Sequence, residues 1–397
     1  MHSSNFRTPI VLVGLSVLTV FVASIPLSSI SKTTETPSSP KTLRLPIRRQ
    51  VSSHAKRSNV LSSTLHNEEW DYLIDVKVGT PPQSLSIVLD TGSSDTWVFS
   101  PEACSSDANC AASFDPSDSS TFDEASPGSF AITYNDHSHV EGDYFTDNIG
   151  VGGATISSLM MGLANTGQLS ASTTSSGLMG VGYRANEAVA NVDPANVYPN
   201  MVYEMVSQDI IGSYSYSLWL DDLAASTGTI LFGGYDPSKF QGSLTMMPTL
   251  PDPTKSDGVI SSFLVSMISL GAMYNGKTTT FTSSTFNGAA LLDSGTTNIF
   301  VPSAIYAELA NYFGADENQV VDCKLSQTKG YVSFGFVDAT IQVPFSELAL
   351  LDSTTGLCQL GFFDAGEQLI LGDTFLRSAY VYYDLGNNEI GLAQTVF

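Results

Sequence analysis

Two short segments, one in each half of the chain, share a pattern that limits how the chain can fold. Each is an apolar run that ends in Asp-Ser/Thr-Gly: SIVLDTGSS around Asp90 and ALLDSGTT around Asp293. A carboxylate at the end of a buried strand costs free energy unless it is hydrogen-bonded or partly neutralised. The hydroxyl residue and the glycine after each aspartate supply donors and a tight turn. The pattern therefore predicts two similar halves, each presenting one carboxylate on a turn.

Two such turns that face each other would bring the two carboxylates together. Two close carboxylates cannot both ionise easily, so they share one proton and titrate as a unit. The ionised group can then take a proton from a water molecule while the protonated group donates to a carbonyl oxygen. Asp90 and Asp293 are therefore the candidate catalytic residues for a hydrolysis without a covalent intermediate.

The chain from Trp70 onward favours a mostly β fold. Short runs rich in Val, Ile, Thr, Tyr and Phe, such as DYLIDVKVG and SAYVYYDLG, are separated by Gly, Pro, Asn and Asp. Two segments indicate helices. One is PNMVYEMVSQDII from Pro199, and the other is PSAIYAELANYFG, where Pro302 suits the first turn and Gly314 the end.

The internal repeat continues beyond the two aspartates. Each half has a later apolar-apolar-Gly element, LMG at 178–180 and ILG at 370–372, in the same order. Prolines cluster in MMPTLPDP, residues 246–253, between two strand-like segments. We therefore place the junction between the halves there.

Charge is distributed unevenly along the chain. There are 39 acidic and 16 basic residues, giving a formal net charge of -23, and the first 57 residues hold eight of the basic residues but only one acid, Glu35. An acidic body of this kind argues against nucleic acid as a partner. A basic leader therefore precedes an intensely acidic remainder.

The leader has the features of a targeting and processing segment. Residues 1–24 contain the apolar run IVLVGLSVLTVFVA followed by small residues, which indicates a signal peptide; an uncleaved signal anchor is the alternative. We interpret residues 25–57 as a basic pro-segment that ends in the dibasic pair Lys56-Arg57, the alternative being a solvated linker. The C-terminal GLAQTVF has no hydrophobic tail for a lipid anchor, so we expect no stable membrane anchor.

Four cysteines in a secreted chain suggest two disulfides. Cys104 and Cys110 lie close together, whereas Cys323 and Cys358 lie much further along. The economical pairing is Cys104 with Cys110 and Cys323 with Cys358. No CxxC or HExxH element suggests zinc, and we expect neither a metal nor a cofactor.

Residues 67–397 resemble the pepsin family of aspartic peptidases. The resemblance rests on several elements in order: VLDTGSSDTWV, ITYNDHSHVEGDYFTDNIGVGG, SGLMGVGY, GTILFGGYDPSKFQGSLTMMP, ALLDSGTTNIFVP and LILGDTFLRSAYVYYDLGNNEIGLA. It is most similar to the fungal secreted candidapepsins and yapsins. The resemblance implies a bilobal double-β-barrel fold with the active-site cleft between two homologous lobes, which we place at residues 58–248 and 249–397.

The resemblance also implies an activity and site residues. The chain would be a secreted, monomeric endopeptidase that hydrolyses polypeptides at acid pH in an extracellular or acidic secretory or vacuolar compartment. It would be made as a zymogen inhibited by its own basic pro-segment, whose cations could cover the acidic cleft at neutral pH. Besides the two aspartates, the family motif assigns dyad support to Thr91, Ser93, Ser294 and Thr296, substrate binding to Gly92, Tyr134, Asp136, Gly295, Thr296 and Thr297, and the flap partner to Trp97.

The flap over the site departs from the family pattern. Relatives commonly have Tyr-Gly-Asp/Thr-Gly, whereas this chain has Tyr134-Asn135-Asp136-His137. Asn tolerates left-handed backbone angles, but His137 is a less obvious replacement for glycine. We therefore expect the flap to differ from that of relatives.

Two other functions have less support in the sequence than the endopeptidase. A catalytically silent binding protein on the same scaffold would be expected to lack a dyad acid or its glycine, and both motifs are intact here. A glycoside hydrolase with two acids is supported only by the acidic composition. The pair His137 and His139 alternates on a strand and could bind a metal, although exposed flap residues are the simpler interpretation.

Overall fold

The computed structural model describes residues 41–51, 70–106, 110–135, 137–168, 174–225, 227–255, 258–352 and 355–396. The predicted signal peptide, most of the predicted pro-segment, Lys56-Arg57 and the flap residue Asp136 therefore lie outside the described residues. Within residues 40–397 the chain forms one unit by its internal contacts. None of the helices in the described part is both long and apolar enough to span a bilayer.

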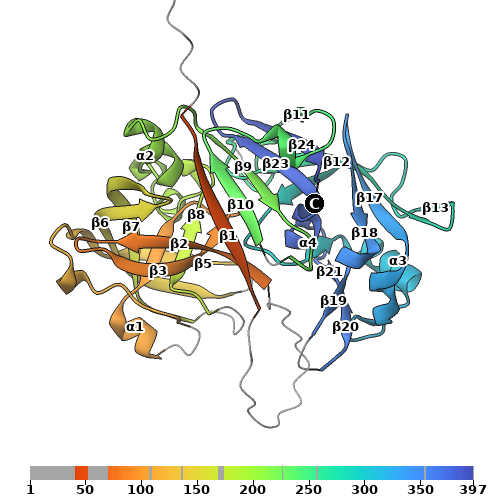
Figure 1. Cartoon of the computed structure of the whole chain (residues 1–397), viewed down its shortest axis with the longest axis horizontal. Helices are drawn as coiled ribbons and strands as arrows, with labels where there is room; N and C mark the ends of the chain where they lie inside the picture. Colours follow the sequence, from red (N-terminus) through yellow and green to blue (C-terminus); the bar gives the residue numbers. More distant parts are fainter. Residues whose placement is uncertain are drawn as a thin grey trace, which may run out of the picture. The chain divides into compact units, whose positions relative to one another are not determined.

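The predicted mostly β fold is confirmed, and its largest sheet within the described residues has 13 strands (Figure 1). The spatial order is β11-β24-β23-β9-β10-β1-β2-β3-β8-β4-β7-β6-β5. In chain order these strands are β1 Leu43–Val51, β2 Trp70–Val78, β3 Gln83–Asp90, β4 Thr96–Phe99, β5 Asp123–Thr133, β6 His139–Val151, β7 Ala154–Gln168, β8 Gly177–Gly180, β9 Ser215–Leu220, β10 Thr227–Phe232, β11 Thr245–Pro248, β23 Ala379–Asp384 and β24 Glu389–Gln394.

Two smaller sheets are built from the second half of the described chain. The first has the order β18-β17-β12-β14-β22-β15-β21, with β13 paired to β12, and the second has the order β16-β20-β19. Their strands are β12 Leu264–Tyr274, β13 Lys277–Thr280, β14 Gly288–Leu292, β15 Ile299–Val301, β16 Val320–Val321, β17 Gly330–Phe336, β18 Thr340–Pro344, β19 Ala349–Leu351, β20 Cys358–Leu360, β21 Phe362–Asp364 and β22 Ile370–Leu371.

The internal repeat predicted from the sequence has a structural counterpart. In the first half, the LMG strand β8 lies parallel to β3, with Leu178 beside Val88 and Gly180 beside Asp90. In the second half, the ILG strand β22 lies parallel to β14, with Ile370 beside Leu291. The orders β3-β8-β4-β7 and β14-β22-β15-β21 are thus equivalent, and each places its aspartate where the first strand of the set ends.

The two halves share strands and core. The C-terminal strands β23 and β24 join the large sheet, where β23 pairs with β9 from the first half. Aromatic rings also pack between the halves. The ring centroid of Phe263 lies 5.0 Å from that of Tyr183, and Tyr216 stacks on Tyr383 with the centroids 4.8 Å apart. Phe263 also packs on Tyr383, within the second half, at 4.6 Å. The boundary between residues 248 and 249 falls at the end of β11, and as a boundary between lobes it stays a prediction.

Both predicted helices are present, with different bounds. α3 runs from Ser303 to Phe313, with Pro302 as its N-cap rather than inside the first turn, and Gly314 ends it with a left-handed φ of 70°. The helix predicted from Pro199 is shorter than its apolar pattern suggested. α2 covers only Met201–Ser207, because the chain turns away at Asp209, whose φ is 59°. The remaining α-helices are α1 Pro101–Ser106 and α4 Asp373–Leu376.

The cysteines pair as predicted. Cys104 is bonded to Cys110 and Cys323 to Cys358. The first bond joins α1 to the segment that follows it, and the second joins the 3-10 helix η6 Cys323–Gln327 to β20. Each disulfide therefore closes a loop within its own half.

The part of the basic leader that the structure describes is a strand inside the large sheet. β1 pairs antiparallel with β10 on one side and with β2 on the other (Figure 1). Its side chains alternate, so that Leu45 and Ile47 are buried while Pro46 and Arg48 are exposed. Arg49, also buried, donates through Nη2 to the carbonyl oxygen of Leu223. Residues 43–51 are thus part of the fold rather than only a charged cover.

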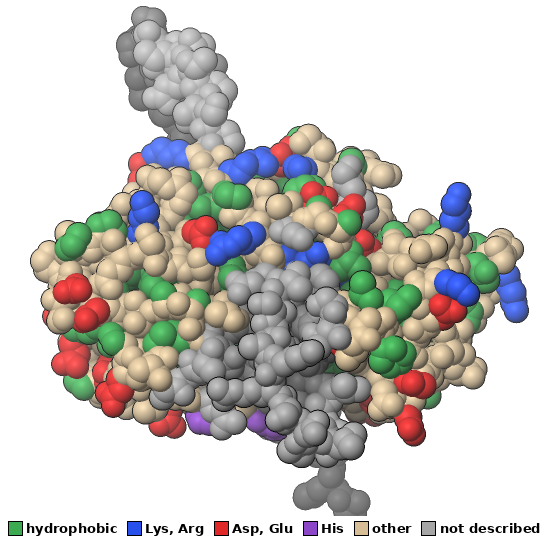
Figure 2. Space-filling model, turned by 60° about the horizontal axis from the view of Figure 1, so that its bottom comes forward, with side chains coloured by type: hydrophobic (Ala, Val, Ile, Leu, Met, Phe, Trp, Pro, Cys, Tyr) green, Lys and Arg blue, Asp and Glu red, His purple; other side chains and the backbone are tan. Residues whose placement is uncertain are grey.

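Cations of the leader pair with carboxylates of the acidic body. Arg44 contacts Asp236 at 2.6 Å, Arg48 contacts Asp75 at 2.5 Å, and Lys41 contacts Asp209. Figure 2 shows basic side chains across the upper part of one face and acidic side chains along its lower rims. Since these pairs are largely exposed, each contributes no more than about 1 kcal/mol, and the apolar face of β1 contributes the larger share.

Replacing Ile47 should therefore destabilise the full chain far more than replacing its exposed neighbour. We expect Ile47→Ala to lower the free energy of unfolding by about 2–4 kcal/mol through the cavity it leaves. Arg48→Ala on the opposite face should cost less than about 1 kcal/mol. Urea denaturation of the unprocessed protein at one pH measures both, and equal losses would contradict the burial of β1.

Candidate active site

The first aspartate is held by the turn that follows its own strand. Asp90 is the last residue of β3 and is 5% exposed. Its Oδ1 accepts a hydrogen bond of 2.7 Å from the Gly92 amide, and its Oδ2 accepts one from the Ser93 hydroxyl. Two donors inside one turn thus offset part of the cost of burying this carboxylate.

The second aspartate is held in the same way. Asp293 follows β14 directly and is 8% exposed. Its Oδ1 accepts from the Gly295 amide at 2.9 Å, and its Oδ2 accepts from the Thr296 hydroxyl at 2.7 Å. The two halves therefore supply identical donor types to identical oxygens.

The glycines show that the two turns face each other closely. A Cβ atom added to Gly92 would lie 2.5 Å from Asp293 Oδ1, and one added to Gly295 would lie 2.5 Å from Asp90 Oδ1. Each glycine thus sits against the carboxylate of the other half, where no larger residue fits. The structure brings together the carboxylate pair that the sequence predicted.

The residues between aspartate and glycine brace the two turns against each other. The Thr91 amide donates to Ser294 Oγ at 3.2 Å, and the Ser294 amide donates to Thr91 Oγ1 at 2.9 Å. Each hydroxyl then donates across to the opposite strand, Thr91 to the Leu292 carbonyl and Ser294 to the Leu89 carbonyl. Four reciprocal hydrogen bonds, all buried, therefore fix the separation of the carboxylates.

Burial and mutual repulsion make the pair hard to ionise fully. Burial raises the pKa of Asp90 well above its ordinary value, and the neighbouring charge of Asp293 raises it further. Hydrogen bonds from Ser93 and Gly92 oppose this rise without cancelling it. Asp90 therefore retains a proton over a wider pH range than an exposed aspartate would.

The predicted flap is a hairpin of β5 and β6 with Tyr134 near its tip. Trp97 Nε1 donates to the Tyr134 hydroxyl at 2.8 Å, so the structure joins the two residues that the family motif paired. His137, at a position where the family pattern has glycine, has a left-handed φ of 68°, which glycine adopts readily. The histidine thus preserves the turn at some backbone strain.

The remaining predicted substrate-binding residues surround the pair. Gly92 and Gly295 form the turns themselves, and Thr296 is the donor to Asp293. Thr297 is 7% exposed, and its carbonyl accepts from the Thr374 amide and hydroxyl, each at 2.9 Å. The Thr297 carbonyl is thus already hydrogen-bonded within the protein.

Sequence reasoning missed two polar residues next to the first turn. Asn186 donates through Nδ2 to the Gly92 carbonyl at 3.0 Å, although it is 94 residues away in sequence. Asp95, five residues after Asp90, is fully buried and accepts three hydrogen bonds. The position of an acid directly before the buried strand β4 was a signal for Asp95, whereas no local pattern marks Asn186.

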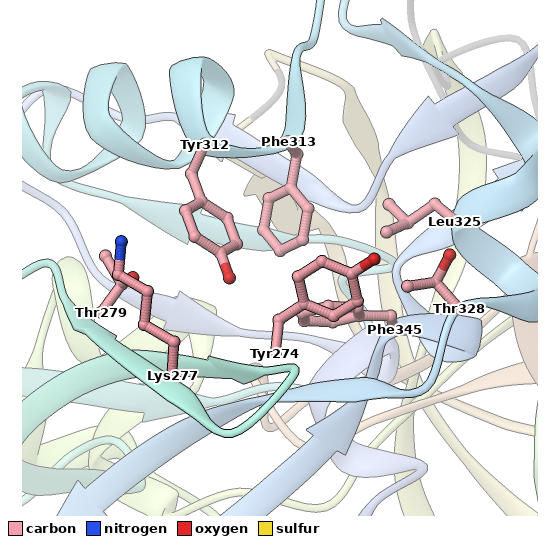
Figure 3. A pocket seen from close by; sticks show the side chains of 8 residues that line it. All are labelled: Tyr274, Lys277, Thr279, Tyr312, Phe313, Leu325, Thr328 and Phe345. Atoms are coloured by element: carbon pink, nitrogen blue, oxygen red, sulfur yellow. The ribbon is translucent and has the colours of Figure 1, made fainter.

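One further hollow lies elsewhere in the second half (Figure 3). It encloses about 340 Å³, and its aromatic walls come from β12, α3 and the 3-10 helix η7 Phe345–Glu347. The lining residues are Tyr274, Lys277, Thr279, Tyr312, Phe313, Leu325, Thr328 and Phe345. None of them belongs to an Asp-Ser/Thr-Gly turn. Within the described residues, no three His, Cys, Asp or Glu side chains form a group that could hold a metal ion.

Comparison with known proteins agrees with this geometry. The family model for eukaryotic aspartyl proteases matches residues 71–395. The chain belongs to the eukaryotic aspartyl protease family, and it is an aspartic-type endopeptidase of the pepsin-like kind that acts on polypeptides.

Several of the similar proteins are fungal. The chain is 37% identical to the probable aspartic-type endopeptidase opsB of Aspergillus fumigatus, over 86% of this chain and 72% of that protein. It is 34% identical to the aspartic proteinase yapsin-3 of Saccharomyces cerevisiae, over 86% and 70%, and 32% identical to barrierpepsin of the same yeast, over 83% and 61%. The aspartic proteinase from Irpex lacteus has the same fold, with a TM-score of 0.69 at 22% identity over 90% of this chain and 98% of that one.

The reciprocal bracing of the turns predicts coupled losses of stability. Thr91→Val keeps the shape of the side chain but leaves the buried Ser294 amide without its acceptor, at a cost of about 1–3 kcal/mol. Ser294→Ala should cost a similar amount for the equivalent reason. Because the two residues share hydrogen bonds, the double variant should lose clearly less than the sum. Denaturant titration of the four proteins tests this, and additive losses would mean that the two turns are braced independently.

Proposed function

We propose that Asp90 and Asp293 are the catalytic dyad with which this endopeptidase hydrolyses peptide bonds at acid pH. The observation that carries the proposal is the position of each turn's glycine against the carboxylate of the other turn. The two carboxylates are thus close enough to bind one water molecule between them.

The raised pKa of Asp90 suggests how the two acids divide the work. Asp293 takes a proton from the water, whose oxygen attacks the peptide carbonyl carbon. Asp90 donates its proton to the carbonyl oxygen, which gives a neutral tetrahedral gem-diol without a covalent intermediate. Asp293 then gives its proton to the amide nitrogen while Asp90 takes one from a hydroxyl of the gem-diol, so that the C–N bond breaks and the pair again holds one proton.

The surrounding residues fit supporting roles in this proposal. Ser93 and Thr296 donate to the carboxylates, and Thr91 and Ser294 brace the two turns, as their hydrogen bonds indicate. Tyr134, placed by Trp97, would close over an extended substrate together with Asp136. Backbone and hydroxyl groups of Gly92, Gly295, Thr296 and Thr297 would bind the substrate main chain.

Synthesis as a secreted zymogen is the second part of the proposal. The predicted signal peptide and the two disulfides suit an oxidising compartment. The place of β1 in the large sheet supports the view that the leader folds with the enzyme body. We propose that the mature enzyme is a monomer, released to the exterior or an acidic compartment.

Protonation of the leader's partners is not sufficient to release it. Although burial opposes the effect, hydrogen bonds from Ser238 and Arg44 lower the pKa of Asp236 to about 2. A carboxyl whose pKa is lowered on folding keeps its stabilising contribution until the pH falls through that lowered value. The Arg44–Asp236 pair therefore persists through most of the acid range, and cleavage of the chain becomes the decisive step.

Removing either catalytic acid should abolish cleavage. We expect Asp293→Asn and Asp90→Asn each to lower kcat/KM at least about 100-fold, since general acid–base catalysis is lost. Wild-type activity should fall as pH rises through the raised pKa of Asp90, because the proton donor is then lost. Peptide hydrolysis measured from pH 2 to 8 checks both. A variant that keeps its activity, or a wild-type rate that still increases towards pH 8, would refute the assignment.

Processing should depend on the dibasic pair. Replacing Lys56 and Arg57 together by alanine should yield a secreted protein that is longer and less active than the wild type. Mass determination of the secreted protein and its rate on a peptide substrate measure both effects. Replacing Arg44 and Arg48, the two exposed basic residues of β1, serves as the control, and unchanged mass and activity in the Lys56/Arg57 variant would reject the site.

A further inference from the structure

Asp95 is a buried carboxylate that the catalytic proposal does not use. It precedes β4 and its side chain is inaccessible to solvent. Its Oδ1 accepts from the hydroxyls of Tyr198 at 2.6 Å and Tyr144 at 3.2 Å, and its Oδ2 accepts from the Ala188 amide at 2.7 Å. We call Asp95, Tyr144, Glu187, Ala188 and Tyr198 the Asp95 network.

The network joins the flap to a segment on the far side of Asp95. Tyr144 belongs to β6, the returning strand of the flap hairpin, and its ring packs against Phe130 of β5 at 5.3 Å. The other donors, Ala188 and Tyr198, belong to residues 184–198, which contain the 3-10 helices η2 Arg184–Asn186, η3 Ala188–Asn191 and η4 Pro194–Asn196. Tyr144 and Tyr198 also contact each other, with ring centroids 5.7 Å apart.

Both ends of this connection reach the candidate catalytic groups. Trp97, two residues after Asp95, donates a hydrogen bond of 2.8 Å to the Tyr134 hydroxyl. Asn186, at the other end, donates a hydrogen bond of 3.0 Å to the carbonyl of Gly92 in the first aspartate turn. The Asp95 carboxylate therefore lies at the point where the flap, β4 and the 184–198 segment meet.

One face of the flap hairpin packs outside the main core, although Phe145 on its other face belongs to that core. Trp97, Phe130, Val140 and Tyr144 belong to a small apolar cluster of their own, which Tyr198 flanks. A small cluster supplies less apolar burial to fix the flap than the continuous core would. Polar contacts at its edge therefore have a larger influence on where the flap lies.

Position 298 in the second half is equivalent to position 95, so it shows which contacts of Asp95 the fold itself requires. The Gly180 amide donates to the backbone carbonyl of Asp95 at 3.0 Å, and the equivalent Gly372 amide donates to the backbone carbonyl of Asn298 at 3.2 Å. A neutral amide side chain thus occupies the equivalent buried place in the second half. The carboxylate of Asp95 is needed for its side-chain contacts, which include the flap, rather than for the strand arrangement.

A second buried acid, Glu187, fixes the backbone of Tyr198 in the network. The Tyr198 amide donates to Glu187 Oε2 at 2.9 Å, while Glu187 Oε1 has no hydrogen-bond partner among the described residues. Burial raises the pKa of Glu187 to about 8, although the hydrogen bond from the Tyr198 amide and, less strongly, the cation Arg184 oppose the rise. Glu187 is therefore neutral at acid pH, and it adds no negative charge beside Asp95 there.

We propose that Asp95 is a positioning residue for the flap, whose carboxylate fixes the hairpin of Tyr134 to the 184–198 segment through Tyr144 and Tyr198. The inference rests on the proposed function in that it takes the hairpin to close over substrate. Asp95 itself touches neither the substrate nor Asp90 in this proposal. Its loss should weaken substrate binding while leaving the chemistry of the dyad largely intact.

The test compares three variants with one matched control. Asp95→Asn keeps the shape of the side chain and adopts the residue found at the equivalent position 298, but its amide group cannot accept from all three donors. Tyr144→Phe and Tyr198→Phe each remove one donor. Tyr380→Phe removes a buried hydroxyl that donates to Ser217 at 2.7 Å in the large sheet, away from the flap. All are assayed as secreted, processed protein on an internally quenched peptide.

We expect the three network variants to raise KM about 10-fold, the value of one lost hydrogen bond, with kcat within about 3-fold of wild type. Amide hydrogen exchange in residues 139–146 should become faster by a similar factor in these variants but not in Tyr380→Phe. If Asp95→Asn does not fold, the two tyrosine variants carry the test. An unchanged KM and unchanged exchange would overturn the inference, as would a fall in kcat alone.

The same assay separates this inference from the proposed function. If wild-type cleavage persists in Asp90→Asn or Asp293→Asn, the dyad assignment fails, whatever the network variants do. If cleavage depends on both aspartates and the network variants behave like Tyr380→Phe, the dyad stands and Asp95 is only a structural residue. Slower flap exchange in Asp95→Asn would also contradict the proposed anchoring.

Discussion

The forced proximity of two buried carboxylates is the constraint on which the rest of this structure depends. Asp90 and Asp293 come from opposite halves of the chain, and each is pressed against the glycine of the other's turn. Repulsion between them is held in check by paired donors in each turn and by the reciprocal hydrogen bonds of Thr91 and Ser294. The shared core and the crossing strands β23 and β24 keep the halves together against this repulsion.

The symmetry of the pair contrasts with the asymmetry around it. Strand orders, turn donors and glycine contacts repeat between the halves, yet a buried carboxylate stands at position 95 and a buried amide at position 298. The half with the carboxylate also carries the flap and a small apolar cluster separate from the main core. The difference between positions 95 and 298 therefore lies on the side of the molecule that carries the flap.

The basic leader serves two physical purposes in the described structure. Its cations meet carboxylates of the strongly acidic body, and its apolar residues fill one face of the central sheet. Exposed ion pairs are weak and some persist at low pH, whereas buried side chains such as Ile47 do not respond to pH. Packing of its apolar residues therefore holds β1 in the sheet more strongly than its charges do.

The sequence by itself determined the features that are encoded locally. Repeated turns around Asp90 and Asp293, alternating β patterns, the end of α3 at Gly314 and the cysteine pairing all depend on short stretches of chain. The tertiary structure alone decided the contacts between distant residues: the place of β1 between β10 and β2, the bond from Asn186 to Gly92, and the three donors around Asp95. No local pattern specifies such partners, because they are chosen by which strands pair and which faces are buried.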